Sequence, residues 1–185
     1  SKMNSFKKLN SIPLISNISH SYVDPFVEWW FSTNDDIYSP NSIFSSHPIF
    51  ISNWNESNNS WTDFTKNEYL DIKSRDITSF SRVNNFLYIG TQRGLLIFDI
   101  KNKDWTLIDE SNGLSSNIIN DIEFANNNIY IATVSGLTIL TTLGNSILDI
   151  EVFDIYKRNS VYNINHIDEK LLIASEIGIY EYDYR

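Results

Sequence analysis

Histidine and cysteine, the residues that most often bind metal ions or act as acid, base or nucleophile, form no catalytic pattern in this chain. The sequence has 185 residues and three histidines, His20, His47 and His166, none at a ligand spacing such as His-x-x-x-His. It has no cysteine, which excludes disulfides, thiolate metal sites and a cysteine nucleophile. We expect each histidine to lie in a loop or on a strand surface.

Acidic residues, the other usual source of catalytic or metal-binding groups, come in close pairs. The pairs are Asp35-Asp36, Asp109-Glu110, and Asp121 with Glu123. None belongs to the Asp-x-Asp-x-Asp-Gly pattern of a calcium loop, and the chain has neither a Gly-rich phosphate loop nor a Gly-x-Ser-x-Gly elbow. We interpret these acids as solvated hairpin tips. The sequence therefore predicts no catalytic residue, no metal site and no cofactor.

The charge of the chain argues against nucleic acid as a partner. The net charge is −9, and the only adjacent cations are Lys7-Lys8 and Lys157-Arg158, whereas phosphate contacts require clustered Lys and Arg. No apolar run is long enough to span a bilayer. We also expect no signal peptide, because the apolar stretch after Lys7-Lys8 is too short.

One nine-residue phrase, which has the form strand, turn, strand, occurs three times at a fixed spacing. The copies cover residues 87–95, 129–137 and 171–179, so that Gly94, Gly136 and Gly178 are 42 residues apart. Three residues before each glycine stands a hydroxyl, on Thr91, Thr133 or Ser175. A tight turn explains this pair, because the hydroxyl can bond the turn backbone while glycine accepts a positive φ.

The flanking residues complete four antiparallel strands per repeat. An earlier strand opens at Ile77, Ile119 or Val161, and a later one is clearest at 104–108. A period near 42 residues built from short strands predicts an all-β fold, a β-propeller of about four four-stranded blades. We expect an N-terminal extension at 1–25 and a propeller domain at 26–185, with blades at about 35–75, 76–117, 118–160 and 161–185.

The number of repeats leaves the form of the propeller open. A small closed ring, an open half-ring that associates and a fragment of a longer protein all fit this length. The last repeat lacks a fourth strand, and the aromatic run at 26–33 could supply it by folding back. The alternative is that 26–33 belongs to an irregular first blade. Effective concentration within one chain favours a closed monomer over a homodimer or a partner added at the strand edge.

The repeat resembles a known family. Trp105 and Thr106, the link Gly113-Leu114-Ser115-Ser116-Asn117 and the hairpin at 129–137 are similar to the two-component regulator propeller repeat. The resemblance covers residues 76–185, although the tryptophan of the family's hairpin is replaced by Tyr88, Tyr130 and Leu172. It implies a sensor or surface protein part with an extracytoplasmic location, periplasmic, surface or secreted.

The propeller architecture indicates where a ligand would bind. The turns between second and third strands and the links into the next blade gather around the channel on one face. The candidates on this face are Gln92, Arg93, Ser115, Asn117, Ser135, Arg158, Asn159 and Glu176. We therefore expect a non-catalytic module that binds a protein or a glycan. The alternatives are a lyase- or hydrolase-type propeller enzyme and a structural subunit that associates through open blade edges.

Overall fold

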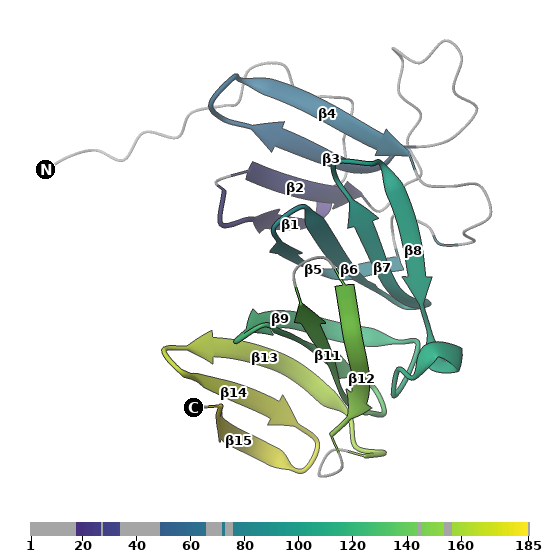
Figure 1. Ribbon diagram of the computed structural model, residues 1–185, viewed down its shortest axis with the longest axis vertical. Helices are drawn as coiled ribbons and strands as arrows, with labels where there is room; N and C mark the ends of the chain where they lie inside the picture. Colours follow the sequence, from purple (N-terminus) through teal and green to yellow (C-terminus); the bar gives the residue numbers. More distant parts are fainter. Residues whose placement is uncertain are drawn as a thin grey trace, which may run out of the picture.

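Short apolar strands and tight turns build most of the described chain into antiparallel sheet (Figure 1). The computed structural model describes residues 18–26, 28–33, 49–65, 72, 76–143, 146–153 and 157–184. Within these residues there are fifteen strands in four sheets and one short 3-10 helix at Glu110–Asn112. The fold is a β-propeller of four blades, as the repeat predicts.

Each sheet is one blade, and its strands pair in chain order from the innermost outward. Blade 1 consists of β1 (Ile18–Val23), β2 (Glu28–Thr33), β3 (Ile49–Asn55) and β4 (Ser60–Thr65). Blade 2 consists of β5 (Ile77–Val83), β6 (Phe86–Thr91), β7 (Gly94–Asp99) and β8 (Asp104–Ile108). Blade 3 consists of β9 (Ile119–Ala125), β10 (Asn128–Thr133), β11 (Gly136–Leu143) and β12 (Ser146–Val152). Blade 4 has three described strands, β13 (Val161–Ile167), β14 (Lys170–Ser175) and β15 (Gly178–Asp183).

The repeated phrase forms the hairpin between the second and third strands, and its turn has the predicted chemistry. In each copy the hydroxyl donates to the carbonyl oxygen of the glycine three residues later. These bonds are Thr91 to Gly94 at 2.6 Å, Thr133 to Gly136 at 3.0 Å and Ser175 to Gly178 at 2.9 Å. The φ angles of the three glycines are 122°, 149° and 130°, so the predicted positive φ is confirmed.

The core lies between blades rather than within them. We call the face of each sheet toward the preceding blade its leading face and the opposite face its trailing face. On β6, Leu87 and Ile89 belong to the leading face and pack in one cluster with Trp30 of blade 1. Tyr88, between them, belongs to the trailing face and packs in a second cluster with Ile129 of blade 3. Alternation along a strand thus joins each blade to both of its neighbours.

The four blades form an open arc. The innermost strands β1, β5, β9 and β13 lie side by side in chain order. Blades 1 and 4 lie at opposite ends of the long axis of the molecule (Figure 1). The closed monomer that the sequence favours is therefore not the arrangement found in the structure.

The predicted closure of the last blade by residues 26–33 is also wrong. Residues 28–33 form β2, which pairs with β1 through Trp30 and Tyr22 and with β3 through Trp29 and Trp54. Blade 1 thus begins at Ile18 rather than near residue 35, and the expected extension at 1–25 contains β1. A hairpin with a short loop is easier to close than a pairing with a distant blade, which explains the difference.

The turn glycines provide a matched test of the repeat. A Cβ at Gly94 would lie 2.7 Å from the carbonyl oxygen of Ile108, whereas a Cβ at Gly178 would meet only a Tyr180 ring carbon at 3.6 Å. Both have a positive φ, so Gly178→Ala should lower the free energy of unfolding by about 1–3 kcal/mol through backbone strain alone. Gly94→Ala should cost more because it adds a clash with backbone. Urea denaturation measures both, and equal losses would contradict the steric account.

Candidate functional site

The turns and links that carry the predicted binding residues are fixed to each other by backbone hydrogen bonds. In blades 2, 3 and 4, the residue after the turn hydroxyl donates its N–H to the residue just before the innermost strand. These bonds are Gln92 to Asp76 at 2.9 Å, Val134 to Ile118 at 3.1 Å and Glu176 to Ser160 at 2.8 Å. We call the end of the blades formed by these turns and links the turn face.

Further backbone bonds join the turn of one blade to the link that enters the next. Gly94 N–H donates to the Asn117 carbonyl at 2.7 Å, and Arg158 N–H donates to the Ser135 carbonyl at 3.0 Å. Arg158 itself has a positive φ of 68°. The structure therefore brings Ser135 and Arg158 together, and the backbone of the turn face is held in place across two blade joints.

Two of the predicted binding residues have structural partners. The Ser115 hydroxyl shares hydrogen bonds with the hydroxyls of Thr133 and Thr138, each at 2.9 Å. The Asn117 side chain accepts from the N–H of Glu110 at 2.8 Å, and the Asn117 N–H donates to the Glu110 carboxylate at 2.8 Å. These hydrogen bonds stabilise the link between blades 2 and 3, so the side chains of Ser115 and Asn117 have a structural role.

The other candidates lie nearer to solvent. Gln92, Arg93, Arg158 and Glu176 are exposed, and Ser135 and Asn159 are half-buried. The guanidinium of Arg93 lies 3.6 Å from the Asp76 carboxylate. Glu176 accepts from the Ser160 N–H at 3.3 Å, and Asn159 donates to the Lys157 carbonyl at 3.3 Å. Ligand binding by these side chains stays a prediction.

The acids Asp121 and Glu123 are not hairpin tips, which corrects the sequence interpretation. Both lie half-buried on the innermost strand β9. The Asp121 carboxylate accepts from the Ile164 N–H at 2.9 Å and from the Asn163 amide at 2.7 Å, which links blade 3 to blade 4. Burial raises the pKa of Asp121, although its backbone hydrogen bonds oppose this. Burial and the neighbouring Asp121 charge raise the pKa of Glu123, and His166 opposes them.

The remaining predicted groups have local roles or lie outside the described residues. Asp109 and Asn112 form a capping box around the 3-10 helix that contains Glu110. His166 is exposed and shares a hydrogen bond with the Tyr184 hydroxyl. His20 lies on β1, and burial lowers its pKa. Asp35, Asp36 and His47 lie outside the described residues. Within the part of the chain that the structure describes, no three His, Asp or Glu side chains lie close enough to form a metal site.

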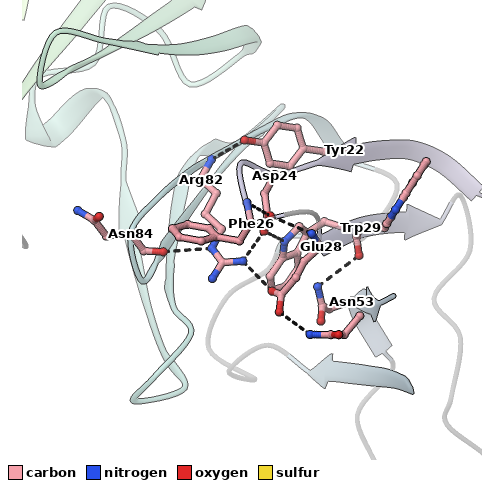
Figure 2. Close-up of polar contacts among 10 residues, drawn as sticks. Tyr22, Asp24, Phe26, Glu28, Trp29, Asn53, Arg82 and Asn84 are labelled. Atoms are coloured by element: carbon pink, nitrogen blue, oxygen red, sulfur yellow. Dashed lines mark hydrogen bonds and ion pairs between the residues drawn. The ribbon is translucent and has the colours of Figure 1, made fainter. Parts of the chain in front are cut away.

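The polar joint between blades 1 and 2 was not predicted from the sequence. The buried Asp24 carboxylate accepts from the Trp30 indole N–H at 2.8 Å and from the Phe26 and Glu28 N–H groups at 2.8 and 3.0 Å (Figure 2). It also pairs with Arg82 of blade 2. The Arg82 guanidinium lies 2.7 Å from the Glu28 carboxylate and 4.5 Å from the centre of the Phe26 ring. In the sequence, Asp24 precedes a proline and Arg82 precedes an Asn-Asn hairpin tip. Neither pattern indicates that these two side chains, 58 positions apart, form a contact.

Comparison with known proteins supports the fold and no narrower identity. No family model and no curated protein sequence matches the chain. Among solved structures, the extracellular domain named as hybrid two-component system BT4673 of B. thetaiotaomicron has a TM-score of 0.56 and 16% identity over 92% of this chain. The structure of YCF48 bound to D1 peptide has a TM-score of 0.62 and 15% identity over 95% of this chain. The computationally designed protein Ika4 has a TM-score of 0.59 and 13% identity over 97% of this chain.

The matched structures differ in how much of their own length this chain covers. The chain spans 27% of the BT4673 domain, 52% of the YCF48 chain and 99% of Ika4. At these identities the likeness shows the propeller fold alone. The similarity to two-component regulator propellers is thus structural, through neighbours that include extracellular domains of such systems. No helix among the described residues is long and apolar enough to cross a membrane.

The joint around Asp24 should dominate the stability of blade 1. Asp24→Asn removes the fully buried carboxylate of the joint and leaves Arg82 with Glu28 alone, and breaking a buried ion pair costs about 3–5 kcal/mol. Lys170→Ala removes the exposed pair that Lys170 forms with Glu181 at 2.6 Å, and such pairs contribute less than about 1 kcal/mol. Chemical denaturation of both variants should show this difference. Similar losses would mean that the Asp24 pair is screened like a surface pair.

Glu123 should make stability depend on pH. Because its folded pKa is raised, the native state holds this proton to higher pH than the unfolded chain. The contribution of Glu123 to the free energy of unfolding is fully present below the pKa of the unfolded chain, about 4.3, and is lost as the pH rises through the folded pKa. Glu123→Gln should therefore raise the Tm at neutral and alkaline pH and change it little in acid. The exposed Glu56→Gln is the control, and a Tm loss for Glu123→Gln in alkali would contradict the burial argument.

Proposed function

We propose that this chain is a non-catalytic binding module that holds a protein or a glycan on its turn face. The observation that carries the proposal is the combination of a repeated, hydrogen-bonded backbone with unlike side chains at equivalent positions. The first variable position of the turn is Gln92, Val134 or Glu176 in successive blades, and the second is Arg93, Ser135 or Ile177. A fixed backbone with varied side chains lowers the entropy cost of binding and allows specificity.

The charges of the turn face favour a polar ligand. Arg93 and Arg158 are exposed cations in a chain with a net charge of −9, and Gln92 and Asn159 offer amides beside them. Arginine presents a planar set of donors that suits carboxylates, and amides suit sugar hydroxyls or peptide groups. Because Glu176 adds an exposed carboxylate to the same face, a peptide or glycan that offers both hydrogen-bond acceptors and donors fits this face best.

Three acids of the described residues that an enzyme could use have structural roles instead. Asp121 holds the first residues of blade 4, and Asp109 caps the 3-10 helix. Asp24 is buried in the joint between blades 1 and 2. These roles support binding over a lyase or hydrolase, which would need at least two converging groups free to reach a substrate.

An extracytoplasmic location is part of the proposal. The fold neighbours include extracellular domains of hybrid two-component systems, and another neighbour is a propeller solved with a bound peptide.

The test is a binding screen with matched charge variants. A glycan array and a displayed peptide library are first screened with the unmodified chain, and the best ligand is titrated against two variants. Arg93→Ala removes an exposed cation from the turn face, and Lys101→Ala removes one from the β7–β8 hairpin at the other end of blade 2. We expect Arg93→Ala to weaken binding about tenfold or more, as for a central interface arginine, and Lys101→Ala to leave it unchanged. Equal affinities of both variants would contradict a site on this face.

A further inference from the structure

The trailing face of blade 4 keeps apolar side chains at several positions that the other blades bury. Positions that pack on the following blade recur every 42 residues, as the repeat requires. Three such series are Val83, Ala125 and Ile167; Tyr88, Tyr130 and Leu172; and Leu95, Leu137 and Ile179. The first two members of each series belong to the clusters between blades 2 and 3 or blades 3 and 4. The third member lies on blade 4.

Two of these positions are exposed to solvent in blade 4, although they are buried in blade 3. Leu95 and Leu137 are 0% and 1% exposed, whereas the equivalent Ile179 is 79% exposed. Ala125 is 2% exposed, and the equivalent Ile167 is 52% exposed. At these two positions the side chain stays apolar while the burial is lost, which is unusual for a solvated strand, although Lys170 and Glu181 lie on the same face, opposite Ile167 and Leu172.

A hollow on the same face is large enough to receive side chains. It has a volume of about 710 Å³ and is lined by Ile167, Asp168, Glu169, Lys170, Leu172 and Glu181. Ile167 and Leu172 stand at the positions of Ala125 and Tyr130, which in blade 3 contact blade 4. The hollow therefore lies where a further blade would pack.

The leading face of blade 1 offers a matching surface at the other end of the arc. Ile18 pairs with Thr33 in blade 1 as Ile77 pairs with Thr91 in blade 2. This register places Trp29 and Phe31 at the positions of Leu87 and Ile89, which pack on the preceding blade. Trp29 is 37% exposed and Val23, its partner on β1, is 45% exposed, whereas Phe31 and Trp54, the partner of Trp29 on β3, are 7% and 2% exposed. Trp29 and Val23 are therefore the accessible part of this face.

We propose that the trailing face of blade 4 binds the leading face of blade 1 of a second copy of this chain. The contact continues the interface that already joins blades 1 to 4, with Ile179 and Ile167 against the aromatic surface of Trp29. A head-to-tail contact forms a closed ring when the rotation of each copy completes the circle. This chain covers 52% of the YCF48 chain, so two copies together have about the length of that propeller. The surface is separate from the turn face.

The mass of the chain in solution tests the proposal. Size-exclusion chromatography with light scattering across a wide concentration range should give about twice the 21.5 kDa of one chain. Ile179→Lys and Val23→Lys should each reduce the mass to that of one chain. Ile118→Lys changes an isoleucine that is 44% exposed but lies outside both faces, and it should remain dimeric. Ile167→Lys is a second trailing-face variant, and circular dichroism verifies that each variant is folded.

Mixing the variants tests the head-to-tail geometry. The Ile179→Lys chain keeps an intact leading face, and the Val23→Lys chain keeps an intact trailing face. An equimolar mixture should therefore form a heterodimer through one interface, although each variant alone is monomeric. A dimer of Val23→Lys alone would show that two trailing faces pair, which overturns the proposal. An unmodified chain that stays monomeric at every concentration overturns it as well.

Discussion

The constraint on which the structure depends is that each blade is apolar on both faces. The second strand of blade 2 alternates Leu87, Tyr88 and Ile89, and all three side chains are buried although they point to opposite faces. A sheet of this kind cannot fold alone, because both of its apolar faces would then meet water. Each blade therefore stabilises its neighbours, and the free energy of folding lies mainly in the contacts between blades.

Polar contacts hold the blades in two different ways. On the turn face they are bonds between backbone groups. Within blades 2, 3 and 4, Gln92, Val134 and Glu176 donate to the residue before the innermost strand, and Gly94 and Arg158 donate across the joints between blades. Elsewhere the joints use side chains that differ from blade to blade, such as Asp24 with Arg82 and Asp121 with Asn163. Backbone bonds leave side chains free to vary, whereas a buried ion pair does not tolerate change. A surface that recognises ligands is thus more compatible with the turn face.

The sequence predicts those features that depend on local chemistry. The glycine and hydroxyl of each turn and the hairpin around them follow from residues three positions apart, and the structure confirms them. Strand β1 was missed because Ile18–Val23 is a largely polar segment with no copy of the repeated phrase after it. The joint of Asp24 with Arg82 depends on where two blades meet, which no local pattern specifies. Asp121 and Glu123 were misplaced because acids on an innermost strand resemble acids in a loop when only sequence is considered.

The composition of blade 4 follows from the same constraint. Repeat proteins need terminal repeats with a polar outer face to stay soluble, so a terminal sheet would be expected to replace Leu95 and Leu137 by a polar residue. Blade 4 has Ile179 at this position, although on the same face Glu181 stands at the position of Ile97 and Ile139. Lys170 and Glu181 form an ion pair in the lining of the hollow, next to Ile167 and Leu172. Apolar side chains combined with charged ones are found at many protein interfaces, and the exposed Ile167 and Ile179 are the residues that a bound blade would bury.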